Sequence, residues 1–418
     1  MAGPGRAPGG YTTGMAEPQS IVIAGASLAG IRAATAARRA GFKGRLTLIG
    51  AENHLPYDRP PLSKQILLGA WEAPRTQLVT DAELAKLDLD LRLGRRAVGL
   101  DTAARRLALD DGQAVDYDAL IIATGAAPRT IPGTPKLDGI FTLRTIEDSI
   151  AIRDRMRKGA RTVVVGAGFI GAEVAAAALQ RGLDVTIVEP LSQPLERALG
   201  ARVGEVAGRR LRDEGAEMRM GLTVAGFEGD GRVERVLISD GSSVDADLVI
   251  VGIGVRPETG WLESSGIALN DGVVCDAYLQ TSAAGVYAAG DVCRWYNPLY
   301  GEEMRVEHWT CAVEQGMAAA RNIVGGPEKA KPYAPVPYVW SDQFDLSIMY
   351  VGHATADDDL VIKHGSLEEG QFVGLYGRNG RLAAAVSFNR PRELGDYRRM
   401  IADGANMEQA IAHVIVDE

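Results

Sequence analysis

Two glycine-rich turns are the parts of this sequence most able to do chemistry. The first reads Ile-Val-Ile-Ala-Gly-Ala-Ser-Leu-Ala-Gly over residues 21–30, and the second reads Val-Val-Val-Gly-Ala-Gly-Phe-Ile-Gly over residues 163–171. Each follows a short apolar strand and opens a helix, so backbone N–H groups and a helix N-terminus stabilise a pyrophosphate there. The residues expected to bind the two dinucleotides are Gly25, Ser27, Ala29 and Gly30 in the first turn, and Gly166, Gly168, Phe169, Ile170 and Gly171 in the second. Two dinucleotide sites in one chain indicate electron transfer between them.

Ser27 occupies the position of the middle glycine in the first turn. A glycine there lets the backbone approach the pyrophosphate, and a Cβ loosens that fit. Serine is the smallest polar substitute, and its hydroxyl can donate to a phosphate. We therefore expect the substitution to be tolerated.

An acidic residue follows each turn at the end of the next strand, namely Glu52 and Glu189. A carboxylate at this place accepts hydrogen bonds from the adenosine ribose. At Glu189 it would also repel a 2′-phosphate, which predicts NAD rather than NADP in the second site. The alternative is a solvated acid at the end of a strand.

Lys64 ends the stretch Pro-Pro-Leu-Ser-Lys that follows the first ribose acid. The prolines favour a helix start, which would hold the lysine at a fixed place near a bound ring. A cation beside a flavin stabilises its anionic reduced form. The alternative is a surface lysine on a capped helix.

From about Ile21 to Asp403 the chain resembles the oxygenase-coupled NADH-dependent ferredoxin reductases, which are FAD flavoproteins of the glutathione-reductase structural class. The motifs that carry the resemblance are Pro60-Pro61-Leu62-Ser63-Lys64, Ala123-Thr124-Gly125, Gly166–Glu173, Ala289-Gly290-Asp291-Val292, Glu307-His308-Trp309 and Trp340-Ser341-Asp342-Gln343. The resemblance implies that the first turn binds FAD and the second binds NADH.

The resemblance also implies roles for single residues. Asp291 would accept from the flavin ribitol, Arg129 would pair with the FAD pyrophosphate, and Glu173 would lie near the nicotinamide. Trp309 and Trp340 would lie beside the flavin ring, with a place in the core between domains as the alternative. For Glu173 the alternative is an acid that only complements the helix dipole. The implied catalytic residues are thus Lys64, Glu173 and Trp309, and the cofactor-binding set is completed by Arg59, Val98, Ala123, Thr124, Gly125, Glu307, His308 and Gly254.

Cysteine is absent from the helix that carries a Cys-x4-Cys pair in disulfide reductases of this fold. Electrons would then pass directly to a one-electron iron–sulfur acceptor. The resemblance implies that this acceptor is a small ferredoxin, of the [2Fe-2S] type or a related one, that feeds a haem-thiolate monooxygenase or a ring-hydroxylating dioxygenase. Cys275, Cys293 and Cys311 are spaced too widely for a metal site or a disulfide framework. The alternatives are rubredoxin or oxygen as acceptor, or an NADH-sensing flavoprotein that acts as a binding module.

Composition limits the partners. The 418 residues carry a net charge of −9, so no basic surplus exists to neutralise nucleic acid. The sequence has no apolar run of membrane-spanning length, and we expect a cytoplasmic monomer or homodimer. Residues 1–19 are expected to be a disordered tail, and Met15 is a possible alternative start.

The predicted fold is α/β, with two Rossmann-like dinucleotide-binding domains and a C-terminal α+β domain. The predicted limits are 20–128 and 262–331 for the FAD domain, 129–261 for the NAD domain and 332–418 for the last domain. In this last domain we expect strands over 346–351, 360–363, 372–376 and 382–388, and a helix over 393–403. Asn379-Gly380 predicts a hairpin turn between the last two strands.

Overall fold

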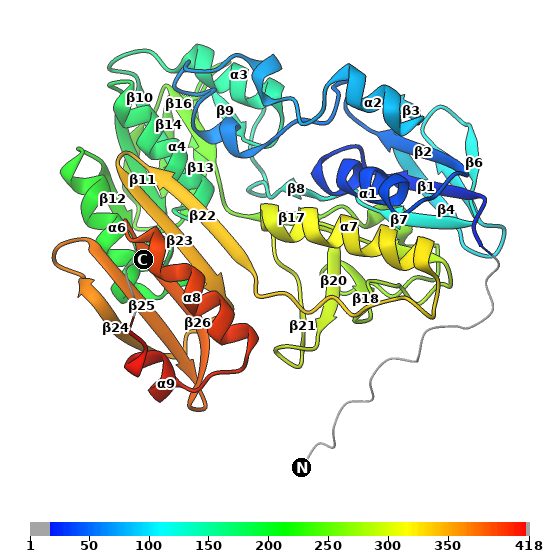
Figure 1. Ribbon diagram of the computed structural model, residues 1–418. Helices are drawn as coiled ribbons and strands as arrows, with labels where there is room; N and C mark the ends of the chain where they lie inside the picture. The colour runs from blue at the N-terminus through cyan, green and yellow to red at the C-terminus, as the bar shows by residue number, and fades with distance from the viewer. Residues whose placement is uncertain (1–16, 415–418) are drawn as a thin grey trace. The chain divides into compact units, whose positions relative to one another are not determined.

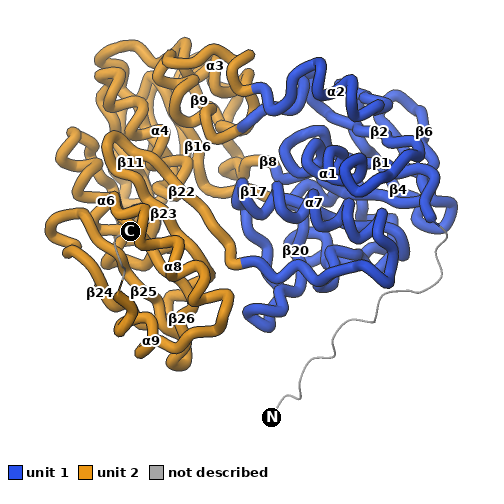
Figure 2. The backbone as a smooth tube through the Cα atoms, in the orientation of Figure 1, with its two compact units in different colours: residues 1–58, 77–126, 257–335 blue, residues 59–76, 127–256, 336–418 orange. Residues whose placement is uncertain are grey.

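The computed structural model describes residues 17–414, so most of the predicted tail, with Met15, lies outside the described residues. The chain forms two compact units (Figure 2). Unit 1 contains residues up to 58 together with 77–126 and 257–335, and unit 2 contains 59–76, 127–256 and the residues from 336 onward. The limits of the three predicted domains remain a prediction.

Unit 1 is built on a five-stranded parallel sheet in the order β19-β7-β1-β2-β3. The strands are β1 (Ser20–Ala24), β2 (Arg45–Gly50), β3 (Asp90–Leu93), β7 (Ala119–Ile122) and β19 (Val286–Ala288). Helices α1 (Leu28–Arg39) and α7 (Trp309–Gly325) pack closely on each other. The inner strands are apolar runs because both of their faces are buried.

Smaller elements complete unit 1. Strands β4 (Ala97–Asp101), β5 (Arg106–Leu109) and β6 (Ala114–Asp116) form an antiparallel sheet. A second small sheet holds β18 (Val273–Cys275), β20 (Cys293–Asn297) and β21 (Glu302–Met304). Helix α2 (Asp81–Leu87) begins with a capping box between Thr80 and Glu83.

Unit 2 repeats the parallel arrangement, with the sheet order β12-β11-β10-β16-β9. Its strands are β9 (Ile140–Thr142), β10 (Arg161–Val165), β11 (Asp184–Glu189), β12 (Glu217–Met220) and β16 (Leu248–Val251). Its helices are α3 (Ile146–Arg155), α4 (Phe169–Gln180), α5 (Glu196–Leu199) and α6 (Ala201–Asp213). Helix α4 is alanine-rich and is buried along most of its length, because it packs on other elements on more than one side.

A second, antiparallel sheet follows in unit 2, in the order β22-β23-β26-β25-β24. Its strands are β22 (Tyr338–Gln343), β23 (Leu346–Gly352), β24 (Asp359–Ser366), β25 (Gln371–Arg378) and β26 (Arg381–Phe388), and it is accompanied by α8 (Pro391–Ala402) and α9 (Met407–Ala412). The four predicted strands and the long helix are confirmed with ends shifted by a few residues. Asn379 and Gly380 both have positive φ, 51° and 77°, as the predicted hairpin turn requires. Neither β22 nor α9 was predicted.

Three further strands, β13 (Val224–Glu228), β14 (Arg235–Ile238) and β15 (Ser243–Asp245), form a small antiparallel sheet in unit 2. Strands β8 (Ala126–Pro128) and β17 (Val255–Pro257) form a two-stranded sheet. The predicted fold class is confirmed, since each unit has its own parallel sheet and the C-terminal sheet is antiparallel (Figure 1).

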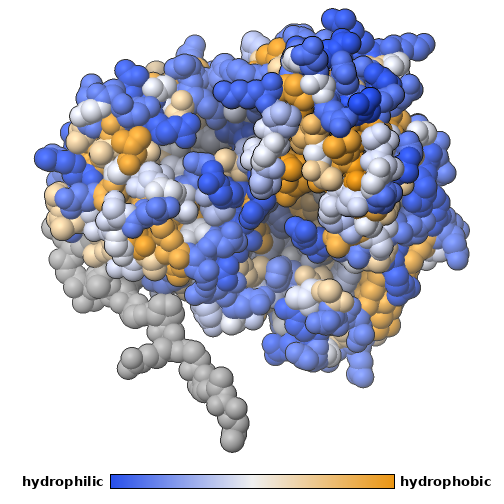
Figure 3. Space-filling model, turned by 180° about the vertical axis from the view of Figure 1, so that it is seen from behind, coloured by the Kyte–Doolittle hydropathy of each residue, from blue (hydrophilic) through white to orange (hydrophobic). Residues whose placement is uncertain are grey.

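The surface agrees with the charged composition. On the face shown in Figure 3, hydrophilic residues predominate and hydrophobic residues gather in separate patches. Over residues 17–414, no helix is both long enough and apolar enough to cross a membrane.

Candidate functional site

In unit 1, the first glycine turn lies where the sheet order changes direction, between β1 and β7. Gly25 has φ of 127°, and a Cβ there would lie 2.0 Å from the carbonyl oxygen of Ala123. A Cβ on Gly30 would lie 1.8 Å from the carbonyl oxygen of Gly25. Only glycine fits at these two positions, as a tight strand-to-helix turn requires.

Helix α1 begins directly after this turn with Ser27 as its N-cap. The Ser27 side chain makes no capping hydrogen bond. The first N–H groups of the helix, which have no partner within the helix, are therefore not capped by that hydroxyl. This arrangement fits the pyrophosphate of a dinucleotide and leaves the serine hydroxyl available as a further donor.

The carboxyl ends of three strands are tied together beside the turn. Ala123 N–H donates to the carbonyl oxygen of Ala24 (2.7 Å), and Ala289 N–H donates to that of Ile122 (2.9 Å). The N–H of Gly290 donates to the buried side-chain oxygen of Gln315 in α7 (2.8 Å). A Cβ on Gly290 would lie 3.2 Å from the Cβ of Ala29. The structure thus brings the turn, Ala123 and the residue before Asp291 to one edge of the sheet.

Other predicted residues of unit 1 already have protein partners. Glu52 accepts a short hydrogen bond from the Tyr57 hydroxyl (2.5 Å). The indole N–H of Trp309 donates to Asp58 Oδ1 (2.6 Å), so this donor is engaged by the protein. Thr124 Oγ1 donates to the carbonyl oxygen of Glu258 (3.0 Å), and the carbonyl oxygen of Gly125 accepts from the N–H of the same glutamate (3.0 Å). Glu307 forms an ion pair with Arg305 (2.8 Å). Val98 lies in β4 with 47% of its surface exposed, and His308 is the N-cap of α7.

In unit 2, the second glycine turn has the same construction. A Cβ on Gly166 would lie 2.4 Å from the carbonyl oxygen of Gly252, and one on Gly171 would lie 2.0 Å from that of Gly166. A Cβ on Gly168, the N-cap of α4, would meet no atom within 4 Å. Open space in front of an uncapped helix N-terminus fits a dinucleotide pyrophosphate. Ile170, in the first turn of α4, exposes 46% of its surface, unusually much for a large apolar residue, and Phe169 begins the same helix.

Glu189 ends β11 and is only 8% exposed. Its Oε2 accepts from the N–H of Ala167 inside the glycine turn (2.7 Å), and its Oε1 accepts from the N–H of Leu191 (3.0 Å). Glu189 is therefore not a solvated acid, because it holds the turn in shape. Because each carboxylate oxygen can accept more than one hydrogen bond, Glu189 can still accept a hydrogen bond from a ribose hydroxyl.

Lys64 and Glu173 form a buried ion pair in unit 2. The 3₁₀ helix η1 (Pro60–Ser63) presents Lys64 at its end, and it packs against α4, which carries Glu173. Lys64 Nζ lies 2.8 Å from Glu173 Oε2, with side-chain exposures of 13% and 3%. Lys64 is therefore not a freely solvated surface lysine, and Glu173 has a direct counter-ion in addition to the helix dipole.

Two hydroxyl groups complete the surroundings of the Glu173 carboxylate. Ser63 Oγ donates to Oε2 (2.5 Å), and Ser341 Oγ donates to Oε1 (2.7 Å). Sequence reasoning missed both serines as functional residues. Ser63 directly precedes Lys64, and Ser341 lies in the Trp-Ser-Asp-Gln stretch, so the motifs contained both without indicating their partner.

Of the remaining predicted residues of unit 2, Trp340 lies in β22, Arg59 is the N-cap of η1, and Arg129 and Gly254 lie in loops. Arg129 is exposed, and its N–H and Nε donate to the carbonyl oxygens of Gly254 (2.9 Å) and Val255 (3.0 Å). Arg59 Nη1 donates to the carbonyl oxygen of Arg144 (2.5 Å). Trp340 stacks on Tyr338, with ring centroids 6.0 Å apart.

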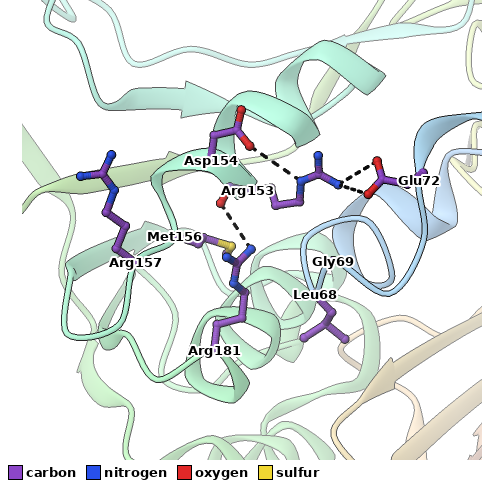
Figure 4. A pocket seen from close by; sticks show the side chains of 8 residues that line it. All are labelled: Leu68, Gly69, Glu72, Arg153, Asp154, Met156, Arg157 and Arg181. Carbon is purple, nitrogen blue, oxygen red and sulfur yellow. Dashed lines mark hydrogen bonds and ion pairs between the residues drawn. The ribbon is translucent and has the colours of Figure 1, made fainter.

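A pocket of about 380 Å³ lies elsewhere in unit 2 and is lined by three arginines (Figure 4). Arg181 Nη1 donates to the carbonyl oxygens of Leu67 (2.7 Å) and Arg153 (3.3 Å). Arg153 in turn contacts Glu72 (3.4 Å). Two of these guanidinium groups are thus engaged with the protein itself, and the pocket is not part of the dinucleotide sites.

Cys275, Cys293 and Cys311 are buried in unit 1 and form no disulfide. Burial raises the pKa of the Cys275 thiol well above its usual value, and the neighbouring Cys293 adds to the effect. A buried, protonated thiol is a poor nucleophile. Among residues 17–414 no group of three or more His, Cys, Asp or Glu side chains could hold a metal ion.

Two family models match this chain. The model described as "Pyridine nucleotide-disulphide oxidoreductase" matches residues 19–316, and the model described as "Reductase C-terminal" matches residues 338–414. The first covers well over half of the chain.

Characterised relatives match nearly the whole chain. The ferredoxin–NAD(+) reductase component of an anthranilate 1,2-dioxygenase system from Burkholderia cepacia is 37% identical over 390 residues, which cover 92% of this chain and 94% of that protein. Putidaredoxin reductase from Pseudomonas putida is 33% identical over 396 residues, with 93% of each chain covered. The crystal structure of a covalent putidaredoxin reductase–putidaredoxin complex matches with a TM-score of 0.90 at 32% identity and covers 94% of this chain and 96% of that one.

Proposed function

This chain belongs to the pyridine nucleotide-disulphide oxidoreductase family and, within it, to the ferredoxin–NAD(+) reductases, and we propose that it passes electrons from NADH to a [2Fe-2S] ferredoxin. FAD and NAD(H) are the cofactors of this family. The observation that carries the proposal is the presence, in each unit, of a glycine turn and a helix N-terminus without a side-chain cap.

FAD would be held in unit 1 by the first turn. The α1 N-terminus and Ser27 are suited to its pyrophosphate, and Glu52 to its adenosine ribose. Asp291, directly after Gly290, is assigned to the ribitol hydroxyls. When bound, FAD takes up a hydride from NADH and releases electrons singly to an iron–sulfur acceptor.

NADH would be held in unit 2 by the second turn. The α4 N-terminus is suited to its pyrophosphate, and the exposed side chain of Ile170 offers apolar contact beside it. Glu189 would accept from the 2′-hydroxyl of the ribose and exclude a 2′-phosphate by charge, which favours NADH over NADPH.

Lys64 and Glu173 supply charge rather than covalent chemistry. An ammonium group has three donors, and one of them is directed at Glu173. Glu173 keeps Lys64 in one orientation, so its remaining N–H groups and its positive charge are presented at a fixed position. We assign Lys64 to the flavin and Glu173 to the nicotinamide side, and no residue acts as a covalent nucleophile.

A ferredoxin acceptor agrees with the thiol chemistry of unit 1, where the three cysteines are buried and do not form a dithiol on the helix that would face a flavin. The relatives named above act with ferredoxins of a dioxygenase system and with putidaredoxin. The reduced ferredoxin would then feed a haem-thiolate monooxygenase or a ring-hydroxylating dioxygenase. We place the reaction in the cytoplasm and expect a monomer or homodimer.

The experiment is NADH oxidation by the FAD-loaded protein with [2Fe-2S] ferredoxins, rubredoxin or oxygen as the single acceptor. We expect fast turnover only with a ferredoxin. Preference for rubredoxin or oxygen would replace the proposed acceptor. Slow reoxidation with every acceptor, together with NADH-driven dimerisation, would indicate an NADH sensor.

A further inference from the structure

The stretch Trp-Ser-Asp-Gln in β22 places two buried polar side chains beside the Lys64–Glu173 ion pair. Its residues alternate along the strand: Ser341 and Gln343 are 0% and 1% exposed, whereas Asp342 between them is exposed. In a strand, alternate residues share a face. The buried face of β22 lies against α4, the helix that carries Glu173.

Hydrogen-bond direction along this face follows from the chemistry of the groups. A carboxylate only accepts, so the Ser341 hydroxyl donates to Glu173 Oε1 (2.7 Å). The amide Nε2 of Gln343 only donates, and it donates to Ser341 Oγ (3.4 Å). Because the serine oxygen accepts from the Gln343 amide, the serine hydroxyl donates its own hydrogen to the Glu173 carboxylate.

The two carboxylate oxygens of Glu173 are contacted by residues from different parts of unit 2. Lys64 and Ser63, next to each other in the chain, both contact Oε2, whereas Oε1 is contacted by Ser341 of the C-terminal sheet. Without the Ser341 hydroxyl, Oε1 of Glu173 would lose its hydrogen bond. The carboxylate could then rotate about the Cγ–Cδ bond of the side chain. A hydrogen bond to a charged group shifts the equilibrium between the orientation that contacts Lys64 and the rotated orientations roughly ten- to a hundredfold.

We propose that Ser341, oriented by Gln343, is a positioning residue that holds the Glu173 carboxylate against Lys64. The C-terminal sheet would then take part in the reaction of NADH by fixing the geometry of the ion pair. This inference rests on the proposed function for its kinetic consequence, but not for its structural one.

The test compares Ser341→Ala with Ser347→Ala in the FAD-loaded protein. Ser347 lies on the neighbouring strand β23, and its hydroxyl donates to Asp342 instead of Glu173 (3.2 Å). The first measurement is the rate of cofactor reduction by NADH in anaerobic stopped flow, separated from the affinity for NADH. The second is the rate at which an amine-reactive acylating reagent labels Lys64, followed by peptide mass spectrometry.

We expect Ser341→Ala to slow cofactor reduction about tenfold, the effect of one hydrogen bond to a charged group, with NADH affinity little changed. Labelling of Lys64 should become faster, because the ammonium group is held less firmly. Ser347→Ala should match the wild-type protein in both measurements. Equal behaviour of the two alanine variants would overturn the proposal, as would slower reduction with unchanged labelling.

Gln343→Leu provides a second variant if Ser341→Ala does not fold. The side-chain oxygen of Gln343 is buried without a hydrogen-bond partner among residues 17–414, so leucine removes an unsatisfied acceptor together with the orienting amide. We expect a smaller change in the same direction in both measurements, and no change would overturn the proposal. If the wild-type protein did not react with NADH, the proposed function would fail, while the labelling comparison would still test the positioning of Lys64.

Discussion

The Nζ atom of Lys64 lies 2.8 Å from Oε2 of Glu173, inside unit 2. Sequence reasoning assigned these residues to two different rings, the flavin and the nicotinamide. The structure joins them into one charged pair, to which two serine hydroxyls also donate. Any change at one member of the pair is therefore expected to alter the other.

The first prediction concerns this ion pair. Lys64→Met leaves a buried carboxylate without its counter-ion and should destabilise the surroundings of α4 by about 3 kcal/mol. The double variant Lys64→Met, Glu173→Leu should recover much of this loss, because paired removal of buried charges is often nearly neutral. Hydrogen exchange of the α4 amides measures both effects. Additive losses in the double variant would mean that the pair does not couple the two side chains.

The second prediction concerns nucleotide choice. Glu189→Arg should lower the ratio of kcat/KM for NADH over NADPH by roughly a hundredfold, because a repulsion of the 2′-phosphate becomes an attraction. The kcat/KM for each nucleotide should also fall, because the Glu189 carboxylate accepts a hydrogen bond from the N–H of Ala167 and so holds the glycine turn in shape. The control is Asp184→Arg, the same change of charge at the exposed start of β11. An equal ratio in Glu189→Arg and wild type would refute the assigned role.

The third prediction concerns the cysteines. Cys275, Cys293 and Cys311 are each at most 2% exposed, so the native protein should react slowly with thiol reagents and keep its activity. Replacement of all three by alanine should preserve NADH-driven ferredoxin reduction in protein that folds. Loss of that activity in a folded triple variant would show that a thiol carries electrons.

The fourth prediction concerns ferredoxin docking on α8, which carries Arg392, Arg398 and Arg399 and has Arg390 as its N-cap. Arg390 pairs with Glu393 (2.7 Å) and Arg399 with Asp396, whereas Arg392 is exposed and forms no ion pair among the described residues. Arg392→Glu should therefore raise the KM for an acidic ferredoxin more than Arg399→Glu does, by up to about fivefold, since exposed pairs contribute ~1 kcal/mol or less.

Ferricyanide provides the control for docking, because it accepts electrons without a protein interface. NADH-dependent ferricyanide reduction should be unchanged in both arginine variants, and added salt should reduce the difference between them with ferredoxin. Equal KM values for ferredoxin in the two variants would place the docking face elsewhere.

Local sequence patterns predicted much of the fold. The two strand–turn–helix units and the C-terminal strands were found because glycine at strand ends and alternation of apolar residues are local signals. Strand β22 was missed, since its residues Tyr338–Gln343 show no simple alternation of apolar and polar types. Their burial is set by packing on α4, which no local window contains.

The site was predictable residue by residue but not as a network. Motifs named Lys64, Glu173 and Glu189, yet the partners of these residues come from distant segments. Ser341 reaches Glu173 only because the antiparallel sheet brings β22 to α4. Likewise, Glu189 was expected to face a ribose, and its bonds to the backbone of its own turn became visible only in three dimensions.

We propose that electrons pass directly from NADH to a one-electron iron–sulfur acceptor, with no thiol relay. The most direct measurement is an anaerobic titration with NADH of the FAD-loaded protein, at catalytic concentration, mixed with oxidised [2Fe-2S] ferredoxin. Since a hydride carries two electrons, we predict that each NADH reduces two ferredoxins, seen as loss of the visible absorbance of the cluster. NADH consumption that leaves the ferredoxin oxidised would contradict it.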